Sequence, residues 1–277
     1  MDNDGKVNGF KPDVRKGQYI LRDKKVINRQ IDYAEITKAD TVLEIGPGFG
    51  ALTLPMAERA GKLIAIEMDS KLCSYLNRHV PTNVELICAD VMKYELPPFD
   101  VVVSNLPYQI SSPVTFKLLS CEFKRGILMY QREFAQRMAA KAGESSYSRL
   151  SINVYYRADC RIMEYVPKTA FFPVPEVDSA IIQLTPRSPP FKVKSEELYF
   201  ALVEGLFSQR RKKIRNSVYG FVAKSMERKG TISKSRIKET MEDMPFKEER
   251  VEQLTPEDIG KLSDWLCDSA MSDITSN

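Results

Sequence analysis

The chain has 277 residues, of which 43% are hydrophobic and 28% are charged, as in folded globular domains and unlike disordered or collagen-like chains. Its length predicts one or two domains. No apolar run approaches the roughly 18 residues of a membrane-spanning helix, and the N-terminus lacks the apolar stretch of a secretion signal. Composition therefore predicts a cytoplasmic globular protein with no membrane span.

Charge and cysteine content exclude further classes. The formal net charge is only +4, so the global field favours a polyanionic partner weakly. The five cysteines are scattered without a C-x-x-C pair, which predicts free thiols rather than a disulfide framework or a zinc site. With His79 as the only histidine, a His-based triad or a His-rich metal site is excluded. We therefore expect chemistry without imidazole.

Basic residues are concentrated in two places along the chain. The first cluster comprises Lys11, Arg15, Lys16, Arg22, Lys24, Lys25 and Arg29. The second comprises Arg210, Arg211, Lys212, Lys213 and Arg215. Such runs form either solvated helix faces or phosphate-binding surfaces, and the segments between them decide which.

From Thr41 onward, short β-branched runs alternate with helix-like segments. Strands are predicted at Thr41–Ile45, Leu63–Glu67, Val84–Cys88 and Phe99–Val103. This alternation predicts a mainly parallel sheet covered by helices. A further strand at Gly126–Tyr130 and a helix at Arg132–Lys141 precede three expected strands, Leu150–Tyr156, Cys160–Val166 and Ser179–Leu184. Successive strands without helices indicate antiparallel additions at one sheet edge.

A proline-rich segment, Thr185 to Pro190, follows the last predicted strand, and proline can neither join a ladder nor continue a helix. We therefore place a domain boundary between residues 187 and 188. Beyond it the pattern is helical, with helices expected at Glu196–Phe207, Lys234–Met244 and from Pro256 through Cys267. The sequence thus predicts a domain at 1–187 and a small all-α domain at 188–277.

A glycine-rich turn follows the first strand of the alternating region, in the string Glu44-Ile45-Gly46-Pro47-Gly48-Phe49-Gly50. Glycines at the carboxyl end of a parallel strand let the backbone approach a ligand closely, as in nucleotide sites. The spacing is G-x-G-x-G rather than the G-x-G-x-x-G of dinucleotide-binding proteins.

Acidic residues end the next two strands. Glu67 is placed to accept hydrogen bonds from both hydroxyls of a ribose. Asp90 is placed to accept the exocyclic amine of an adenine, with Met68 and Val91 on either side of the ring. Three ligand-type signals at three successive strand ends predict an adenosine-containing ligand.

The fourth strand ends in Ser104-Asn105-Leu106-Pro107-Tyr108, which is the sharpest signal in the chain. An adenine amine is a poor nucleophile because its lone pair is delocalised into the ring. The Asn105 side-chain oxygen and the Leu106 carbonyl can each accept one of its hydrogens, which aims the lone pair at a donor carbon. Pro107 fixes the turn. Tyr108 provides a face on which the base stacks.

At this point the sequence resembles the ribosomal RNA adenine dimethyltransferases, and the resemblance covers nearly the whole chain. Besides Glu44–Gly50, Glu67 and Asp90, it rests on Gly17-Gln18-Tyr19-Ile20-Leu21, Asn105 through Ser111, Tyr130 through Ala135, Phe171 through Ser179, and Phe207 through Lys212. The amino-acid sequence of Tyr130–Met138 resembles that of the archaeal members of this family. Tyr19 and Ile20 depart from the usual G-Q-N/H-F-L pattern, so a cofactor contact there is assigned to the backbone.

The resemblance implies a Rossmann-like class I methyltransferase domain with a mainly parallel seven-stranded sheet, plus a C-terminal helical domain that docks on RNA or the ribosome. It implies that S-adenosylmethionine methylates the N6 amines of two adjacent adenosines near the 3' end of small-subunit rRNA, leaving S-adenosylhomocysteine. The cofactor would be held by Gln18, Tyr19, Leu21, Gly46, Gly48, Glu67, Met68, Asp90, Val91 and Asn105. Catalysis would involve Asn105, Leu106, Pro107, Tyr108 and Phe171, with Phe171 opposite Tyr108. The resemblance implies no metal.

The resemblance also implies that both basic clusters bind the RNA backbone, within a partly assembled small subunit and without a protein partner for the chemistry. Three alternatives are weighed against this interpretation. A nicotinamide-dependent dehydrogenase would use the same glycine turn but not Asn-Leu-Pro-Tyr. The same motif could serve large-subunit rRNA or DNA adenine. A ribosome-assembly factor could bind the immature subunit as its main task, with methylation secondary.

Overall fold

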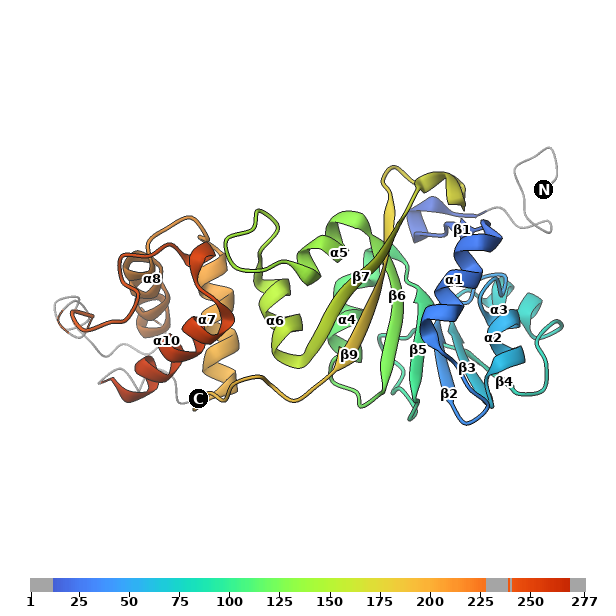
Figure 1. Cartoon of the computed structure of the whole chain (residues 1–277), viewed down its shortest axis with the longest axis horizontal. Helices are drawn as coiled ribbons and strands as arrows, with labels where there is room; N and C mark the ends of the chain where they lie inside the picture. Colours follow the sequence, from blue (N-terminus) through green and yellow to red (C-terminus); the bar gives the residue numbers. More distant parts are fainter. Residues whose placement is uncertain (1–11, 228–238, 240, 270–277) are drawn as a thin grey trace. The chain divides into compact units, whose positions relative to one another are not determined.

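The computed structural model describes residues 12–227, 239 and 241–269, which form two compact units (Figure 1). The first unit comprises the chain up to Gln136 together with Ala158–Arg187, and the second comprises Arg137–Arg157 and the chain from Ser188 onward. The division at 187/188 thus coincides with the expected boundary, but residues 137–157 belong to the helical unit rather than to the 1–187 domain. A single linker in the sequence could not reveal that the chain enters the second unit twice.

A seven-stranded sheet forms the centre of the first unit, in the order β4-β3-β2-β5-β6-β9-β7. Its strands are β2 (Thr41–Ile45), β3 (Lys62–Glu67), β4 (Val84–Cys88), β5 (Val101–Asn105), β6 (Arg125–Gln131), β7 (Ala158–Val166) and β9 (Ser179–Pro186). Strands β2 to β6 pair in parallel, whereas β9 pairs antiparallel with both β6 and β7. The expected mainly parallel sheet with antiparallel strands at one edge is therefore confirmed.

The order of the strands reverses at β2. The chain runs outward from β2 to β3 and β4, then returns to place β5 on the other side of β2. Strands β2 and β5 pair only at Val42↔Val101 and Leu43↔Val102, so their carboxyl ends are not joined by ladder bonds. In open α/β sheets such a switch point is where ligands bind.

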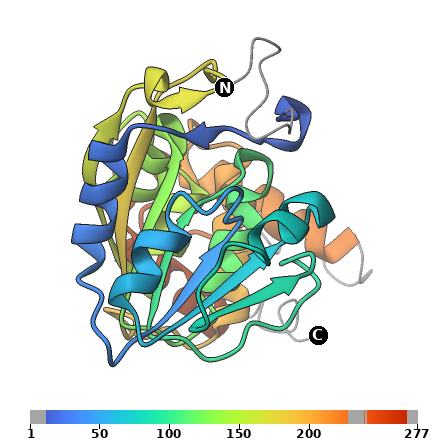
Figure 2. The same ribbon diagram turned by 90° about the vertical axis from the view of Figure 1, so that its right-hand side faces the viewer.

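Helices cover both faces of the sheet: α1 (Lys24–Ala34) and α2 (Thr53–Arg59) lie on one face and α4 (Ser111–Leu118) on the other (Figure 2). The remaining helices of this part of the chain are α3 (Ser70–Leu76) and α5 (Arg132–Ala139). Asp23 begins α1 because its side chain accepts hydrogen bonds from the backbone amides of Lys25 and Val26. Buried Val26, Ile31 and Ala34 then pack on the sheet.

A short pair of antiparallel strands lies outside the main sheet, and one of the two belongs to the segment before α1. Strand β1 (Ile20–Leu21) pairs with β8 (Phe171–Phe172), with Leu21 opposite Phe171. The backbone amide of Arg22 also donates to the carbonyl of Ala170 at 2.8 Å. The Gly17–Leu21 motif and the Phe171–Ser179 motif, far apart in sequence, therefore lie side by side.

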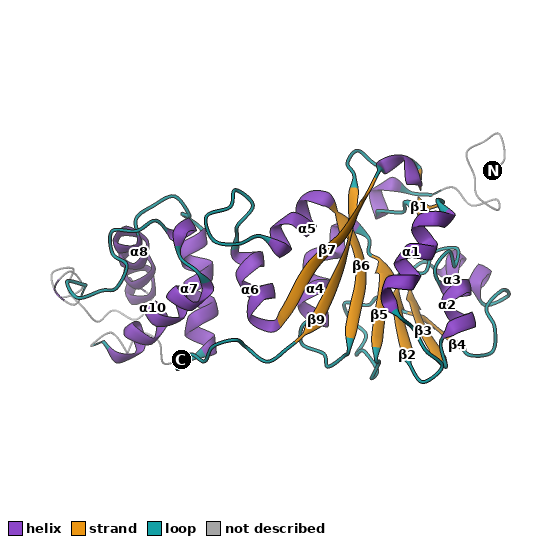
Figure 3. Ribbon diagram, viewed as in Figure 1, coloured by secondary structure: helices purple, strands orange, loops and turns teal. Residues whose placement is uncertain are grey.

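The second unit contains only helices among its described elements, drawn purple in Figure 3. These are the α-helices α6 (Arg149–Arg157), α7 (Glu196–Phe207), α8 (Ile214–Glu227) and α10 (Pro256–Asp268), and the 3₁₀ helix η4 (Val251–Gln253). Ser195 caps α7, and Thr255 forms a capping box with Asp258 at α10, as the sequence predicts. The expected helix Lys234–Met244 lies mostly outside the described residues.

One predicted strand is wrong: residues 150–156 lie within helix α6. Leu150, Ile152, Val154 and Tyr156 are buried, and this alternation imitates a strand. Ile152 and Tyr156, one helical turn apart, instead pack into a cluster with Leu202 and Leu206 of α7. Tertiary packing therefore overrides the β-branched composition of the segment.

The expectation of five free thiols is also wrong, because Cys73 and Cys88 are joined by a disulfide. Cys73 lies in α3 and Cys88 ends β4, and their Cα atoms are 6.1 Å apart. A separation of 15 residues without a Cys motif does not reveal that the fold brings a helix and a strand end together.

Across the described ranges, no helix combines the length and apolarity required to cross a membrane.

Candidate functional site

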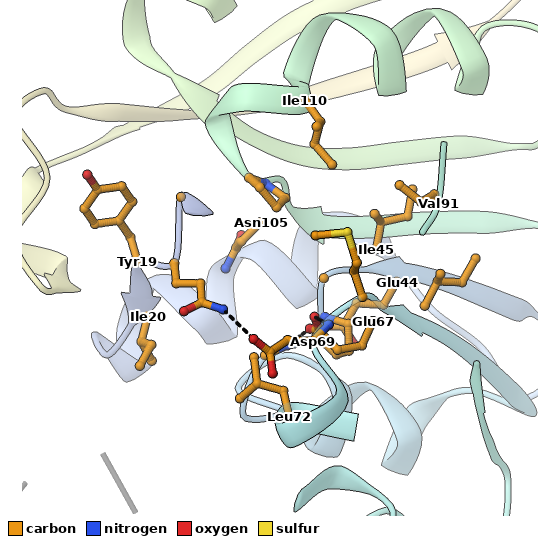
Figure 4. A pocket seen from close by; sticks show the side chains of 18 of the residues that line it. Tyr19, Ile20, Glu44, Ile45, Glu67, Asp69, Leu72, Val91, Asn105 and Ile110 are labelled. Carbon is orange, nitrogen blue, oxygen red and sulfur yellow. Dashed lines mark hydrogen bonds between the residues drawn. The ribbon is translucent and has the colours of Figure 1, made fainter. Parts of the chain in front are cut away.

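A cavity of about 430 Å³ opens at the carboxyl ends of the parallel strands, where β2 and β5 diverge (Figure 4). Small-molecule sites typically measure about 300–1,000 Å³. Every residue expected to hold the cofactor lines this cavity: Gln18, Tyr19, Leu21, Gly46, Gly48, Glu67, Met68, Asp90, Val91 and Asn105. The fold thus brings together residues from five separate segments of the sequence.

The glycine turn forms the floor of the cavity between β2 and α2. Gly46 and Gly48 have φ values of +71° and +60°, in the left-handed region that side chains with a Cβ disfavour. Ser104 braces the opening between the diverging strands, because its Oγ accepts the backbone amide of Ile45 at 2.7 Å. A ligand can therefore approach the backbone of the turn directly.

Glu67 is the acidic group at the end of β3 and is only 7% exposed. Its carboxylate accepts the backbone amide of Gly48 at 3.1 Å and that of Asp69 at 2.9 Å. Burial raises its pKa, while these amide donors act in the opposite direction. The side chain is thus held at the cavity wall by two backbone donors before any ligand binds.

Glu44 lies beneath the turn and is a cavity residue that the sequence interpretation left without a role. Its carboxyl group is buried, and the Thr53 hydroxyl donates to it at 2.6 Å. Burial raises its pKa to about 8. A neutral, hydrogen-bonded carboxyl therefore connects the end of β2 to the start of α2 on either side of the glycines.

Asp90 begins the loop that closes the cavity beyond β4. Its Oδ1 accepts the backbone amide of Met92 at 2.9 Å, and Val91 next to it is buried. Met68, which also lines the cavity, is 67% exposed. An acceptor and two apolar side chains therefore meet here, as an adenine would require.

Sequence reasoning missed Lys117, which holds this loop from behind. Its Nζ donates to the backbone carbonyls of Val91 and Tyr94, at 2.7 and 2.5 Å. Lys117 lies on α4, the helix that follows the Asn105–Tyr108 turn. The Lys117 ammonium group therefore links the loop after β4 to α4, the helix that follows the Asn105–Tyr108 turn. No local signal could have shown this, since the contacts span 26 and 23 residues.

Gln18 lies across the cavity from the start of α3. Its Nε2 donates to Asp69 Oδ2 at 3.4 Å, drawn as a dashed line in Figure 4, and its Oε1 accepts the backbone amide of Asp13 at 2.8 Å. Asp69 also caps α3, because its side chain accepts the Lys71 amide. The segment before β1 thereby forms one wall of the cavity.

Asn105 ends β5 and also lines the cavity. Its side-chain oxygen is buried and, in the described part of the chain, has no hydrogen-bond partner. A buried acceptor without a partner costs free energy unless a ligand satisfies it. Together with the acidic groups and the glycine turn, it makes the cavity suited to an adenosine-containing cofactor beside an amine substrate.

Of the other expected catalytic residues, Pro107 also lines the cavity, whereas Leu106, Tyr108 and Phe171 do not. Leu106 is buried, at 2% exposed. Tyr108 donates or accepts a 2.7 Å hydrogen bond with Ser179 Oγ. Phe171 is 5% exposed and packs in the core with Leu21. The ring that stacks on Tyr108 is that of Tyr19, at 5.6 Å between centroids.

The first basic cluster surrounds the start of α1 and the segment before it. Arg15 pairs with Asp13 at 3.0 Å, and the guanidinium of Arg22 lies 5.7 Å from the centre of the Phe172 ring. Lys24 and Lys25 are exposed. Lys16 belongs to a 3₁₀ helix, Val14–Lys16, and its side chain lies outside the described atoms, as does Lys11.

The second basic cluster is largely paired within its own unit. Arg210 donates to Glu252 at 3.1 Å and to the carbonyls of Ser145 and Tyr147, at 3.0 and 3.2 Å. Lys213 and Arg215 both contact Glu248, each at 2.6 Å. Arg211 and Lys212 are exposed. A run of five basic residues in sequence thus separates into structural and solvent-facing members.

Comparisons with a family model and with individual known proteins find similarity to the same kind of enzyme. Residues 9–257 match the model of the family described as ribosomal RNA adenine dimethylase. The probable ribosomal RNA small subunit methyltransferase A of Methanosarcina acetivorans is 46% identical over 255 residues, covering 91% of this chain and 92% of the relative.

Two solved structures are similar across most of the chain. A dimethyladenosine transferase from Plasmodium falciparum is 32% identical, with a TM-score of 0.75, covering 88% of this chain and 95% of that one. The 23S rRNA methyltransferase ErmE is 28% identical, with a TM-score of 0.64, covering 89% and 99%.

Proposed function

Because this chain belongs to the ribosomal RNA adenine dimethylase family, we propose that it dimethylates the N6 amines of two adjacent adenosines near the 3' end of small-subunit rRNA, using S-adenosylmethionine. The small-subunit assignment is supported by the name of the 46% identical relative, whereas the large-subunit enzyme is 28% identical. The chain is an rRNA adenine dimethyltransferase, and its substrate class and residue roles form the proposal.

The observation that carries the proposal is the buried, unpartnered Asn105 oxygen at the wall of the cavity. An adenine amine placed there donates one hydrogen bond to the Asn105 side-chain oxygen and a second to the Leu106 carbonyl oxygen. Both acceptors draw the nitrogen away from planarity, so that its lone pair becomes available for attack. The buried setting strengthens these hydrogen bonds because water does not compete for them.

S-adenosylmethionine, when bound, supplies a methyl group already activated by its sulfonium charge. Glu67 would hold the ribose hydroxyls, Asp90 the adenine amine, and Met68 and Val91 the faces of that ring. Backbone groups of Gln18, Tyr19, Leu21, Gly46 and Gly48 would hold the remainder. None of these residues needs to transfer a proton.

Catalysis in this site is chiefly positioning. Asn105 and Leu106 fix the nitrogen in line with the methyl donor, and the excess proton leaves to water. The target base must first be extruded from its stack, at a cost of a few kcal/mol that stacking on Tyr108 offsets. Phe171, which packs beside Leu21, would stack on the other face of the base, opposite Tyr108.

RNA binding is assigned to basic residues of both clusters. In the first cluster these are Arg15, Lys16, Arg22, Lys24 and Lys25, and in the second Arg211 and Lys212. Arg210, Lys213 and Arg215 would contribute charge while also stabilising the helical unit through Glu252 and Glu248. We take the natural substrate to be a partly assembled small subunit in the cytoplasm, recognised by 188–277 and methylated by 1–187 without a protein partner.

The test is mass spectrometry of nucleosides from unmethylated small subunits incubated with the protein and S-adenosylmethionine. We expect N6,N6-dimethyladenosine with the wild type and none with Asn105→Ala. Parallel reactions contain large-subunit rRNA and adenine-containing DNA. Dimethylation of either of these, without methylation of the small subunit, would contradict the substrate assignment.

A further inference from the structure

The disulfide of the first unit joins two segments that form the acidic wall of the cavity. Cys73 lies in the middle of α3, and Cys88 is the last residue of β4. Asp69, which caps α3, precedes Cys73 by four residues, and Asp90 follows Cys88 by two. Both aspartates line the cavity. The covalent bond therefore connects the helix behind one of these acids to the strand before the other.

Both cysteines meet at the backbone of Glu67. Glu67 pairs with Cys88 in the ladder between β3 and β4, and its carbonyl accepts the backbone amide of Ala89 at 2.9 Å. The sulfur of Cys73 lies 3.5 Å from the same carbonyl oxygen. The disulfide thus holds α3 and β4 against the residue whose carboxylate is proposed to bind the ribose.

Helix α3 depends on its packing, because it has only seven residues and helices of this length are unstable alone. Leu72, Cys73 and Leu76 are its buried residues. Leu72 also lines the cavity, on the helix that follows Asp69 (Figure 4). A change in how Cys73 is held therefore reaches the cavity wall through its neighbour Leu72 and, one helical turn earlier, through Asp69.

The disulfide is accessible from one of its two ends. Cys88 is exposed, whereas Cys73 is only 4% exposed. Thiol–disulfide exchange requires a thiolate to reach a sulfur atom, and exposed disulfides are the ones that exchange readily. An external thiol can therefore approach this bond from the Cys88 side.

We propose that Cys73 and Cys88 form a redox-modified site that sets the affinity of the cavity for its cofactor, which binds tightly to the disulfide form and more weakly to the dithiol form. This inference rests on the proposed binding of S-adenosylmethionine in the cavity. The reagent that modifies the site is a small-molecule thiol together with its disulfide.

The exchange takes place in two steps. In the oxidising direction, the Cys88 thiolate attacks the small disulfide, forms a mixed disulfide and releases one small thiolate. The Cys73 thiolate then attacks the Cys88 sulfur, forms the disulfide and releases the second small thiolate. The two protons from the cysteines convert the released thiolates to thiols, and reduction follows the same steps in reverse.

The difference in affinity follows from pre-organisation. In the disulfide form, α3 and the end of β4 are held in the arrangement that forms the cavity, which lowers the entropic cost of binding. In the dithiol form, packing retains α3, and the Cys73 thiol is close enough to donate to the Glu67 carbonyl. The fold then persists, but α3 opens locally more often.

The experiment equilibrates the full chain with mixtures of reduced and oxidised glutathione. Alkylation followed by peptide mass spectrometry gives the thiol state of each cysteine, and calorimetry gives the affinity for S-adenosylhomocysteine. Hydrogen exchange reports the opening of residues 70–76. Cys73→Ser and Cys88→Ser each remove the disulfide, and Cys267→Ser, which removes a free cysteine of the second unit, is the control. Thermal unfolding identifies any variant that does not fold.

We expect the reduced wild type to bind S-adenosylhomocysteine on the order of tenfold more weakly than the oxidised form, with faster amide exchange in α3. Both serine variants should show the weaker affinity at every glutathione ratio, whereas Cys267→Ser should respond as the wild type does. Because Cys88 is exposed, Cys88→Ser provides the test even if the buried Cys73→Ser does not fold.

Equal affinity in the two redox states would overturn the inference and leave the disulfide a purely structural role. So would full alkylation of Cys73 and Cys88 after treatment with oxidised glutathione, or a redox response that persists in Cys88→Ser. If the wild type binds S-adenosylhomocysteine equally well in both states, only this inference fails. If it binds none in either state, the proposed function fails and this inference fails with it.

Discussion

The cavity proposed for the cofactor and the place proposed for the target base lie at the same edge of the sheet. The latter, beside Asn105 and between Tyr108 and Phe171, is called the slot. The two differ in how far their side chains are already arranged for binding. The cavity is open, and backbone amides already orient Glu67 within it. At the slot, the Tyr19 ring stacks on that of Tyr108, and the Asn105 oxygen is buried without a hydrogen-bond partner among the described residues. Under the proposed function, this difference predicts that the cofactor enters a preformed site, whereas the base binds only after side chains at the slot rearrange. Pre-organisation lowers the entropic cost of binding.

The largest effect is expected at Asn105, where the two regions meet. Asn105→Ala removes one acceptor for the amine and should lower the methyl-transfer rate at least about 100-fold, as for other preorganised polar contacts. Affinity for S-adenosylhomocysteine should fall much less. Single-turnover kinetics with calorimetry measure both. An equal loss of rate and affinity would mean that Asn105 serves the cofactor cavity rather than the slot.

Asp90→Ala should have the opposite effect, with a loss of cofactor affinity and little change in the methyl-transfer rate. Loss of a charge-assisted hydrogen bond costs about 1.5–3 kcal/mol, so cofactor affinity should drop roughly 10- to 150-fold. The rate at saturating cofactor should stay within about threefold of the wild type, because the slot is unchanged. Glu95→Ala, an exposed acid on the same loop, is the control. A rate loss that persists at saturating cofactor would break the separation between the two regions.

Glu44 should make the region under the glycine turn sensitive to pH. Its carboxyl has an ordinary pKa of 4.5 in the unfolded chain, and burial raises this to about 8 in the folded protein. Below 4.5 both states are protonated and stability is fully present. Between 4.5 and 8 only the unfolded state releases the proton, so the free energy of unfolding falls by about 1.4 kcal/mol per pH unit.

Glu44→Gln should flatten this pH dependence, so the variant should gain stability relative to the wild type as pH rises towards 8. Urea unfolding at several pH values tests it, with the exposed Glu58→Gln as the control for charge removal. Identical pH profiles for Glu44→Gln and the wild type would show that the carboxyl is ionised in the folded protein.

The smallest effect is expected at Lys117, which connects the cavity to the helix after the slot. Lys117→Met keeps the apolar stem but leaves the carbonyls of Val91 and Tyr94 without their donor. We expect KM for S-adenosylmethionine to rise about fivefold while kcat changes less than twofold, with partial recovery in Lys117→Arg. Lys93→Met, exposed on the same loop, should match the wild type. A fall in kcat alone would assign Lys117 to the slot instead.

The sequence by itself determined most of the sheet and the composition of the cavity wall. Strand periodicity, the glycine turn and the acidic residues Glu67 and Asp90 at strand ends are local signals. In a parallel sheet, residues that follow successive strands must meet at one edge. This is why every expected cofactor residue lines the cavity.

Only the tertiary structure decided the features that depend on distant segments. The strand-like pattern of residues 150–156 became helix α6 because Ile152 and Tyr156 find partners on α7. Arg210 is bound by Glu252, which lies 42 residues away, and Lys117 reaches a loop that precedes it by more than 20 residues. The stack of Tyr19 on Tyr108 likewise joins two motifs that the sequence shows separately. Local propensities cannot encode such contacts, because packing energy is gained only after the fold has brought the partners together.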